Sequence, residues 1–239
     1  MASRQEEKQR RREERMEVER QAAAARSRTR RLQGGLGALL AVAVVVGVVL
    51  AVTGGGGGSS GKGPTAPSAK TGAGAIPAPR ERDLAKAVAA AGCTTLDPPI
   101  EGHTHTLSKV TYHSNPPSSG SHNPAPALDG IYDPGNTPTP EHFVHALEHG
   151  RIEVQYAPGT SRHRVSQLET LVSEPLNGKA GYKTLLFQNN TNMPYKVAAT
   201  AWGHILGCPR FRPAVFDALR DFRAKWIDKG PEVGIPPTN

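Results

Sequence analysis

The sequence predicts an α+β sandwich, in which a mixed sheet is packed with helices, preceded by a single transmembrane helix and a Gly/Pro-rich linker. Three observations support this prediction. Charged residues are absent between Arg31 and Lys62, where the chain is first apolar and then rich in glycine. Beyond residue 80, short alternating segments are interleaved with longer segments of helical periodicity. Strands and helices mixed in this order favour an α+β fold.

The first part of the chain indicates a membrane anchor. Residues 1–32 form a basic tail with 11 Lys+Arg against 6 Asp+Glu. The apolar run Gly34–Val52 has 19 residues, which as a helix span roughly 28 Å, close to the thickness of a bilayer's hydrocarbon core. We therefore expect residues 33–53 to be an uncleaved signal anchor, with its basic tail in the cytoplasm. A cleaved signal peptide is the alternative, but its charged region is normally much shorter.

Residues 54–79 are dominated by Gly, Ser, Pro and Ala, which predicts a flexible linker with a reach of roughly 25–30 Å. Residues 80–239 should then form an extracytoplasmic domain held near the outer face of the cell membrane. The tail contributes +5 of the net charge of +8 (11 − 6), and the rest of the chain contributes +3 (18 − 15). Because the basic excess is mainly a topological signal, we expect no nucleic-acid partner.

The only two cysteines, Cys93 and Cys208, both fall in the predicted exported domain. An oxidising compartment favours a disulfide between them. The entropy of closing so long a loop suggests a stabilisation of about 4 to 5 kcal/mol. Two free thiols or metal ligands are the alternative, although no Cys-x-x-Cys spacing supports it.

The first elements of the domain are read from composition. Arg80–Ala91 is rich in alanine and ends at Gly92, which predicts a helix with a glycine C-cap. His105–Tyr112 alternates enough to predict a strand. The residues that follow, 113–138, are dense in Pro, Gly, Ser and Asn, which predicts a loop.

The later elements are read from periodicity. A helix should begin after Thr139 as N-cap, with Pro140 at its first position, and end at Gly150. Strands are expected over residues 151–156, 183–188 and 196–202, and a helix over residues 161–176. A last helix after Pro213 should bury an apolar stripe of Val215, Phe216, Leu219, Phe222, Trp226 and Ile227.

The helix between Thr139 and Gly150 carries three imidazoles and one carboxylate within eight residues. His145 and His149 lie one helical turn apart, so their rings can converge on one metal ion. With Glu148 they spell His-x-x-Glu-His, the inverted zincin pattern, in which the carboxylate activates a zinc-bound water. Seven of the nine histidines fall between residues 103 and 149. Among them, His122 ends a Pro- and Gly-rich loop suited to holding it rigidly.

These motifs carry a resemblance to a known family, domain-of-unknown-function family 3105. The shared pattern runs in order through an early Gly-Cys, Tyr112, Pro116-Pro-Ser-Ser-Gly120-x-His122, Gly130-Ile-Tyr132, His145-Ala-Leu-Glu-His-Gly150, Tyr156, Trp202-Gly203 and Cys208. The resemblance covers most of residues 84–228. That family is typical of bacterial, often actinobacterial, membrane-anchored proteins and has no established activity.

Carried over by position, the resemblance makes His105, His122, His145 and His149 the motif histidines, with Glu148 beside them. His103 competes with His105 for the first of these positions. The tryptophan that often precedes Gly-Ile-Tyr in the family is replaced here by Ala127-Leu-Asp129.

Three functional hypotheses follow. The preferred one is a single-pass membrane protein whose exported domain binds zinc or copper through His122, His145 and His149, with His105 or Glu148 as fourth ligand. The second is a non-enzymatic envelope interaction or scaffold module, in which the histidines brace loops. Ring nitrogens separated by more than roughly 5 Å would favour this hypothesis.

The third hypothesis is a zinc-dependent hydrolase with Glu148 as its catalytic residue. Gly150 ends the helix immediately after His149, and no downstream helical glutamate is placed as a third zinc ligand, because Glu169 and Glu174 fall on a helix whose apolar face is assigned to the core. Both observations weigh against a protease. Hydrolysis also requires Glu148 to face an open cleft beside the metal.

Overall fold

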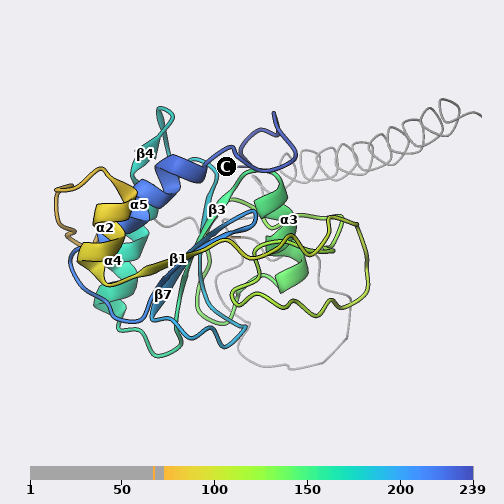
Figure 1. Ribbon diagram of the computed structural model, residues 1–239, viewed down its shortest axis with the longest axis horizontal. Coiled ribbons are helices and arrows are strands. Elements are labelled where there is room, and N and C mark those ends of the chain that lie inside the picture. Colours follow the sequence, from red (N-terminus) through yellow and green to blue (C-terminus); the bar gives the residue numbers. More distant parts are fainter. Residues whose placement is uncertain (1–66, 68–72, 239) are drawn as a thin grey trace, which may run out of the picture. The chain divides into compact units, whose positions relative to one another are not determined.

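The computed structural model describes residue 67 and residues 73–238 (Figure 1). The predicted basic tail, the predicted transmembrane helix and most of the predicted linker lie outside the described residues. Within the described part, no helix is both long and apolar enough to cross a membrane. The described chain forms an α+β fold with a mixed sheet, as predicted.

A six-stranded sheet forms the centre of the fold, in the order β1-β8-β7-β3-β6-β2. Its strands are β1 (Thr94–Leu96), β2 (Gly130–Ile131), β3 (Ile152–Tyr156), β6 (Thr184–Gln188), β7 (Val197–Ala201) and β8 (His204–Cys208). The β3, β6 and β2 strands run parallel, whereas the β3–β7, β7–β8 and β8–β1 pairs are antiparallel. A separate hairpin pairs β4 (Pro175–Leu176) with β5 (Lys179–Ala180).

Helices cover both faces of the sheet, which gives three layers (Figure 1). One face is covered by α2 (Leu84–Ala91), α4 (Arg162–Ser173) and α5 (Val215–Trp226), which enclose the larger apolar core. The other is covered by α3 (Pro140–Glu148) over a smaller core that includes Phe143 and Phe187. The apolar stripe predicted on α5 lies in the larger core, with Trp226 only partly buried. Strand β3 is therefore buried along its whole length.

Helix ends differ from prediction where side chains or proline intervene. Helix α2 begins at Leu84 rather than at Arg80, because Asp83 is the N-cap and accepts a hydrogen bond from the Lys86 amide. It ends at Gly92, as predicted. Helix α4 stops at Ser173, before Pro175, whose ring cannot continue the helical hydrogen bonds.

The predicted strand His105–Tyr112 is wrong. The segment contributes only one isolated parallel bridge, between His105 and His122. The Val110 amide donates to the Glu141 carboxylate instead of to a neighbouring strand. Five strands were not predicted, namely β1, β2, β4, β5 and β8, and β2 interrupts the predicted loop 113–138.

The disulfide between Cys93 and Cys208 is present, as predicted, and joins residues 115 positions apart. Cys208 is fully buried at the end of β8, and Cys93 directly precedes β1. The bond therefore fastens the edge strand β1 and helix α2 to the sheet.

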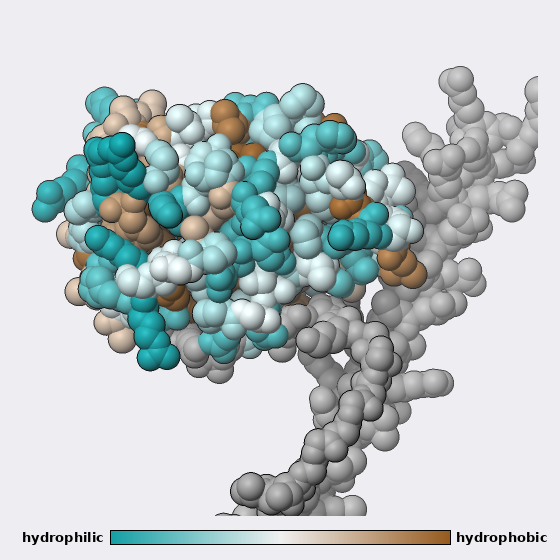
Figure 2. All heavy atoms as spheres, turned by 90° about the horizontal axis from the view of Figure 1, so that it is seen from below, coloured by the Kyte–Doolittle hydropathy of each residue, from teal (hydrophilic) through white to brown (hydrophobic). Residues whose placement is uncertain are grey.

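On the face of the molecule drawn in Figure 2, apolar residues occur in small separate groups among polar ones. Leu107 and Val233 are the most exposed large apolar side chains described, at 84% and 78%. Apolar residues dispersed in this way are normal on a protein surface, so this face does not by itself indicate a docking surface.

Candidate metal centre

Local sequence signals place the histidines of α3. Pro140 occupies the first turn and Thr139 precedes it in an extended conformation, so the helix begins where predicted. Its apolar side chains, including Phe143 and Ala146, pack on the sheet, while His145 and Glu148 lie on a second buried face. Consequently the helix holds both an imidazole and a carboxylate away from bulk solvent.

Gly150 ends the helix in the left-handed region, at φ +74°. A Cβ atom there would lie 2.8 Å from Asp228 Cα. The glycine therefore does more than terminate α3, because it also lets the chain near Asp228 pass close to the helix end.

His105 and His122 lie on two loops, which pair with each other at a single isolated bridge. The Thr106 amide donates to the His122 carbonyl at 2.7 Å, and the His122 amide donates to the Thr104 carbonyl at 3.0 Å. The Tyr112 hydroxyl donates to the Ser121 carbonyl at 2.7 Å. This bridge brings His105 beside His122, with ring centroids 5.0 Å apart.

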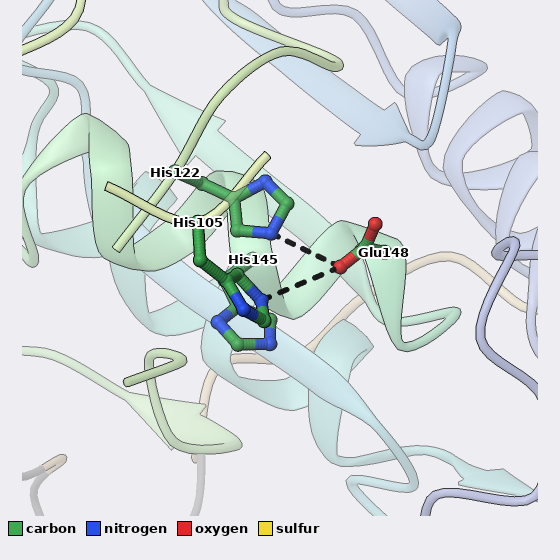
Figure 3. Close-up of side chains that lie close together, drawn as sticks. All are labelled: His105, His122, His145 and Glu148. Atoms are coloured by element: carbon green, nitrogen blue, oxygen red, sulfur yellow. Dashed lines mark ion pairs between the residues drawn. The ribbon is translucent and has the colours of Figure 1, made fainter. Parts of the chain in front are cut away.

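Together these elements form an inner group of four possible ligands: His105, His122, His145 and Glu148. Their ligand atoms all lie within 4.8 Å of one another (Figure 3). Glu148 Oε2 lies 3.0 Å from His122 Nε2 and 3.9 Å from His105 Nε2. Ligand atoms around a tetrahedral zinc ion lie about 3.3 Å apart, so a small contraction of the group would suit an ion.

Hydrogen bonds define which ring nitrogens face the group. Nδ1 of His122 lies 2.8 Å from the Gly120 carbonyl, and Nδ1 of His145 lies 2.6 Å from the Asn123 carbonyl. A carbonyl can only accept, so each Nδ1 carries the proton and each neutral ring keeps a lone pair on Nε2. Metal-binding histidines use this arrangement to fix their orientation.

His122 Nε2 is the least satisfied atom of the group. It is buried and makes no hydrogen bond of good geometry. Its neighbour at 3.0 Å is Glu148 Oε2, an acceptor when ionised. Two acceptors facing each other in a buried site repel unless a cation or a proton lies between them.

A second, outer group consists of His145, His149 and Glu232. The Nε2 atoms of His145 and His149 lie 2.9 Å apart, as expected for residues one helical turn apart. His149 Nε2 also lies 3.1 Å from Glu232 Oε2. The structure thus groups His149 with Glu232 rather than with His122, and His145 belongs to both groups.

Burial keeps these imidazoles neutral. Loss of solvation, followed by the nearby His149, lowers the pKa of His145 from 6.5 to about 3. Loss of solvation, followed by the charge of Arg151, lowers the pKa of His149 to about 4. Near neutral pH, both rings are therefore in the form that binds metal ions.

Exposure differs sharply across the inner group. The His105 side chain is 49% exposed, whereas Glu148 is 5% exposed and His122 is fully buried. Glu148 therefore points into the group of histidines and not into an open cleft (Figure 3). A carboxylate in this position can act as a ligand for a metal ion.

The remaining histidines of the described chain join neither group. His142 lies beside the Thr139 hydroxyl, His113 pairs with Glu101, and His204 pairs with Asp97. The competing His103 is exposed, and so is His163 on α4.

Glu232 was not predicted from the sequence as a candidate ligand. It follows a Gly-Pro pair in a stretch without a ligand motif, so no local signal identifies it.

Comparison with known proteins gives one match. The chain matches the model of a family described as "Protein of unknown function (DUF3105)" over residues 103–239, which is more than half of its length. That interval contains every residue of both groups. No curated protein and no solved structure matches the chain.

Proposed function

The chain belongs to the DUF3105 family of proteins of unknown function, and we propose that its domain binds one transition-metal ion through His105, His122, His145 and Glu148. One observation carries this proposal. The His122 and His145 rings each donate Nδ1–H to a backbone carbonyl, which leaves their Nε2 lone pairs for a cation. His122 Nε2 is buried, with a carboxylate oxygen 3.0 Å away.

The donor set selects the kind of ion. Three imidazoles and one carboxylate suit zinc or copper better than calcium or magnesium, which prefer oxygen ligands. Four protein ligands can fill a tetrahedral shell, as in zinc sites that hold the ion without performing chemistry on it. The burial of Glu148 withdraws support from the zinc-hydrolase hypothesis, which needs that carboxylate beside an open position.

The proposed location is the outer face of a cell membrane. The predicted signal anchor at residues 33–53 and the disulfide between Cys93 and Cys208 support it, because disulfides persist in oxidising compartments. In this proposal a flexible linker keeps the metal-binding domain close to the membrane.

Metal analysis of the purified full-length chain tests the proposal. The wild type, loaded with Zn²⁺ or Cu²⁺ at neutral pH and freed of loose ions, should retain one ion per chain. His122→Ala and His145→Ala should retain less than a tenth of that, since each removes a buried ligand. His163→Ala, which removes an exposed histidine on α4, is the matched control and should behave as the wild type. No stoichiometric ion in the wild type would contradict the proposal.

A structural role is the second candidate, and the contact of 3.0 Å between His122 Nε2 and Glu148 Oε2 favours it. A proton held between these atoms would tie the His122 loop to α3 without any ion. In that case a strong chelator leaves the free energy of unfolding unchanged. If an ion is bound, chelation lowers it by about 2.7 kcal/mol relative to protein in metal at one hundred times Kd.

A further inference from the structure

The C-terminal segment, residues 228–238, runs across the end of α3. The Asp228 amide donates to the Gly150 carbonyl at 2.9 Å, and the Glu232 amide donates to the Glu148 carbonyl at 3.0 Å. Gly230 lies so close that a Cβ atom there would be 2.2 Å from the Glu148 carbonyl oxygen. These contacts bring Glu232 over the histidines of α3.

The far end of this segment is also fastened. The Thr238 amide donates to Asp129 Oδ2, and the Asp129 amide donates to Thr238 Oγ1, both at 2.7 Å. Arg151, fully buried, pairs with Asp129 and donates to the Pro236 carbonyl at 2.7 Å. Glu232 is thus anchored from both sides.

The outer group opens to solvent through Glu232, whereas the inner group is exposed only at His105, whose side chain is 49% exposed. Glu232 is 40% exposed and His149 is 11% exposed, whereas Glu148 is 5% exposed. His145 is common to both groups, but its Nδ1 is occupied by the Asn123 carbonyl. Only its Nε2 remains, and one lone pair binds one ion at a time. The two groups are therefore alternative positions for a single ion.

We propose that His149 and Glu232 form an outer position for the ion, through which it enters and leaves the inner group. The inference rests on the proposed function, because it requires an ion in the inner group. The ion first binds Glu232 and His149, and then binds His145. It keeps His145 while His122, Glu148 and His105 replace the two outer ligands. When the ion binds, the His149 ring proton moves from Nε2 to Nδ1; after that only coordination bonds exchange, and His145 Nε2 bridges the two positions.

Exchange kinetics test this pathway. Zn²⁺ binding to the full-length chain is followed by stopped flow with a chromophoric chelator, which gives kon, koff and Kd. Removing one ligand of a weak site lowers its occupancy about tenfold or more, so Glu232→Gln should slow both kon and koff by about that factor. Because the outer position is passed in both directions, Kd stays at the wild-type value. Glu169→Gln, the same substitution on α4 across the sheet, is the matched control and should exchange at the wild-type rates.

The outcomes separate the two proposals. If the wild type takes up no Zn²⁺, the proposed function fails, and the outer position fails with it. If the wild type binds Zn²⁺ and Glu232→Gln exchanges at wild-type rates, the ion enters past the exposed His105 and only the outer position is overturned. A faster koff with a weaker Kd also overturns it, since Glu232 would then support the inner ion directly. Thr238→Ala, which loosens the segment but keeps every ligand, should slow exchange in the same direction.

Discussion

Substitution of Gly150 by alanine tests whether the C-terminal segment packs on α3. The position has φ +74°, and an alanine there incurs the usual cost of the left-handed conformation, about 1 to 2 kcal/mol. Its Cβ would also lie 2.8 Å from Asp228 Cα and 3.2 Å from the Gly230 amide nitrogen, both backbone atoms. Forcing these apart adds about 1 to 3 kcal/mol. We expect Gly150→Ala to lower the free energy of unfolding by about 2 to 5 kcal/mol in all.

Gly159 provides a matched control, because its φ is +77° and nothing lies within 4 Å of its Cβ position. Gly159→Ala should therefore lower the free energy of unfolding only by the cost of the left-handed conformation, about 1 to 2 kcal/mol. Urea unfolding of the full-length chain measures both, and tryptophan fluorescence reports this domain because Trp202 and Trp226 are the only tryptophans. Equal losses at the two glycines would refute the close packing of the segment against α3.

Three further predictions concern the stability of the domain. Burial raises the pKa of Glu153 well above 4.5, so the folded state keeps a proton that the unfolded state releases. The stability from this group is fully present below pH 4.5 and is lost above it by up to about 1.4 kcal/mol per pH unit. Glu153→Gln should be more stable than the wild type at pH 8 and equal to it at pH 4 in urea unfolding; parallel pH profiles would contradict this. Arg223→Met leaves α4 carbonyls, including that of Leu171, without their donor, so it should lower the free energy of unfolding by about 3 kcal/mol. Lys225→Met, on the exposed side of α5, should change the free energy of unfolding little. Reduction of the wild-type disulfide should lower the free energy of unfolding by about 4 to 5 kcal/mol, and an unchanged urea midpoint would exclude that contribution.

Features of the site that depend on neighbouring residues could be predicted from the sequence. The ends of α3 were predictable because a helix is stabilised within itself. Pro at its first turn and Gly after its last act on their own backbone neighbours. The convergence of His145 and His149 follows from the same geometry, since residues four apart always share a helix face.

The strand prediction for His105–Tyr112 failed because alternation alone does not supply a partner. The Val110 amide donates a hydrogen bond to the Glu141 carboxylate. Only His105 pairs with another segment, through an isolated bridge to His122. The full burial of β3 could not be predicted from the sequence either. Its alternation of charged and apolar residues suggests one exposed face, but helices cover both faces of the sheet, and Glu153 is buried.

By itself the sequence determined the α+β class, the boundaries of α3, the disulfide and the pairing of His145 with His149 on one helix face. These depend on periodicity, capping, cysteine count and motif spacing, which are properties of neighbouring residues or of simple counts. Only the tertiary structure decided that Glu148 is a buried partner of His122, that His149 turns toward Glu232, and that His145 lies between two groups of ligands. Each of these contacts joins segments distant along the chain, and it forms only after sheet, loops and C-terminal segment have packed together.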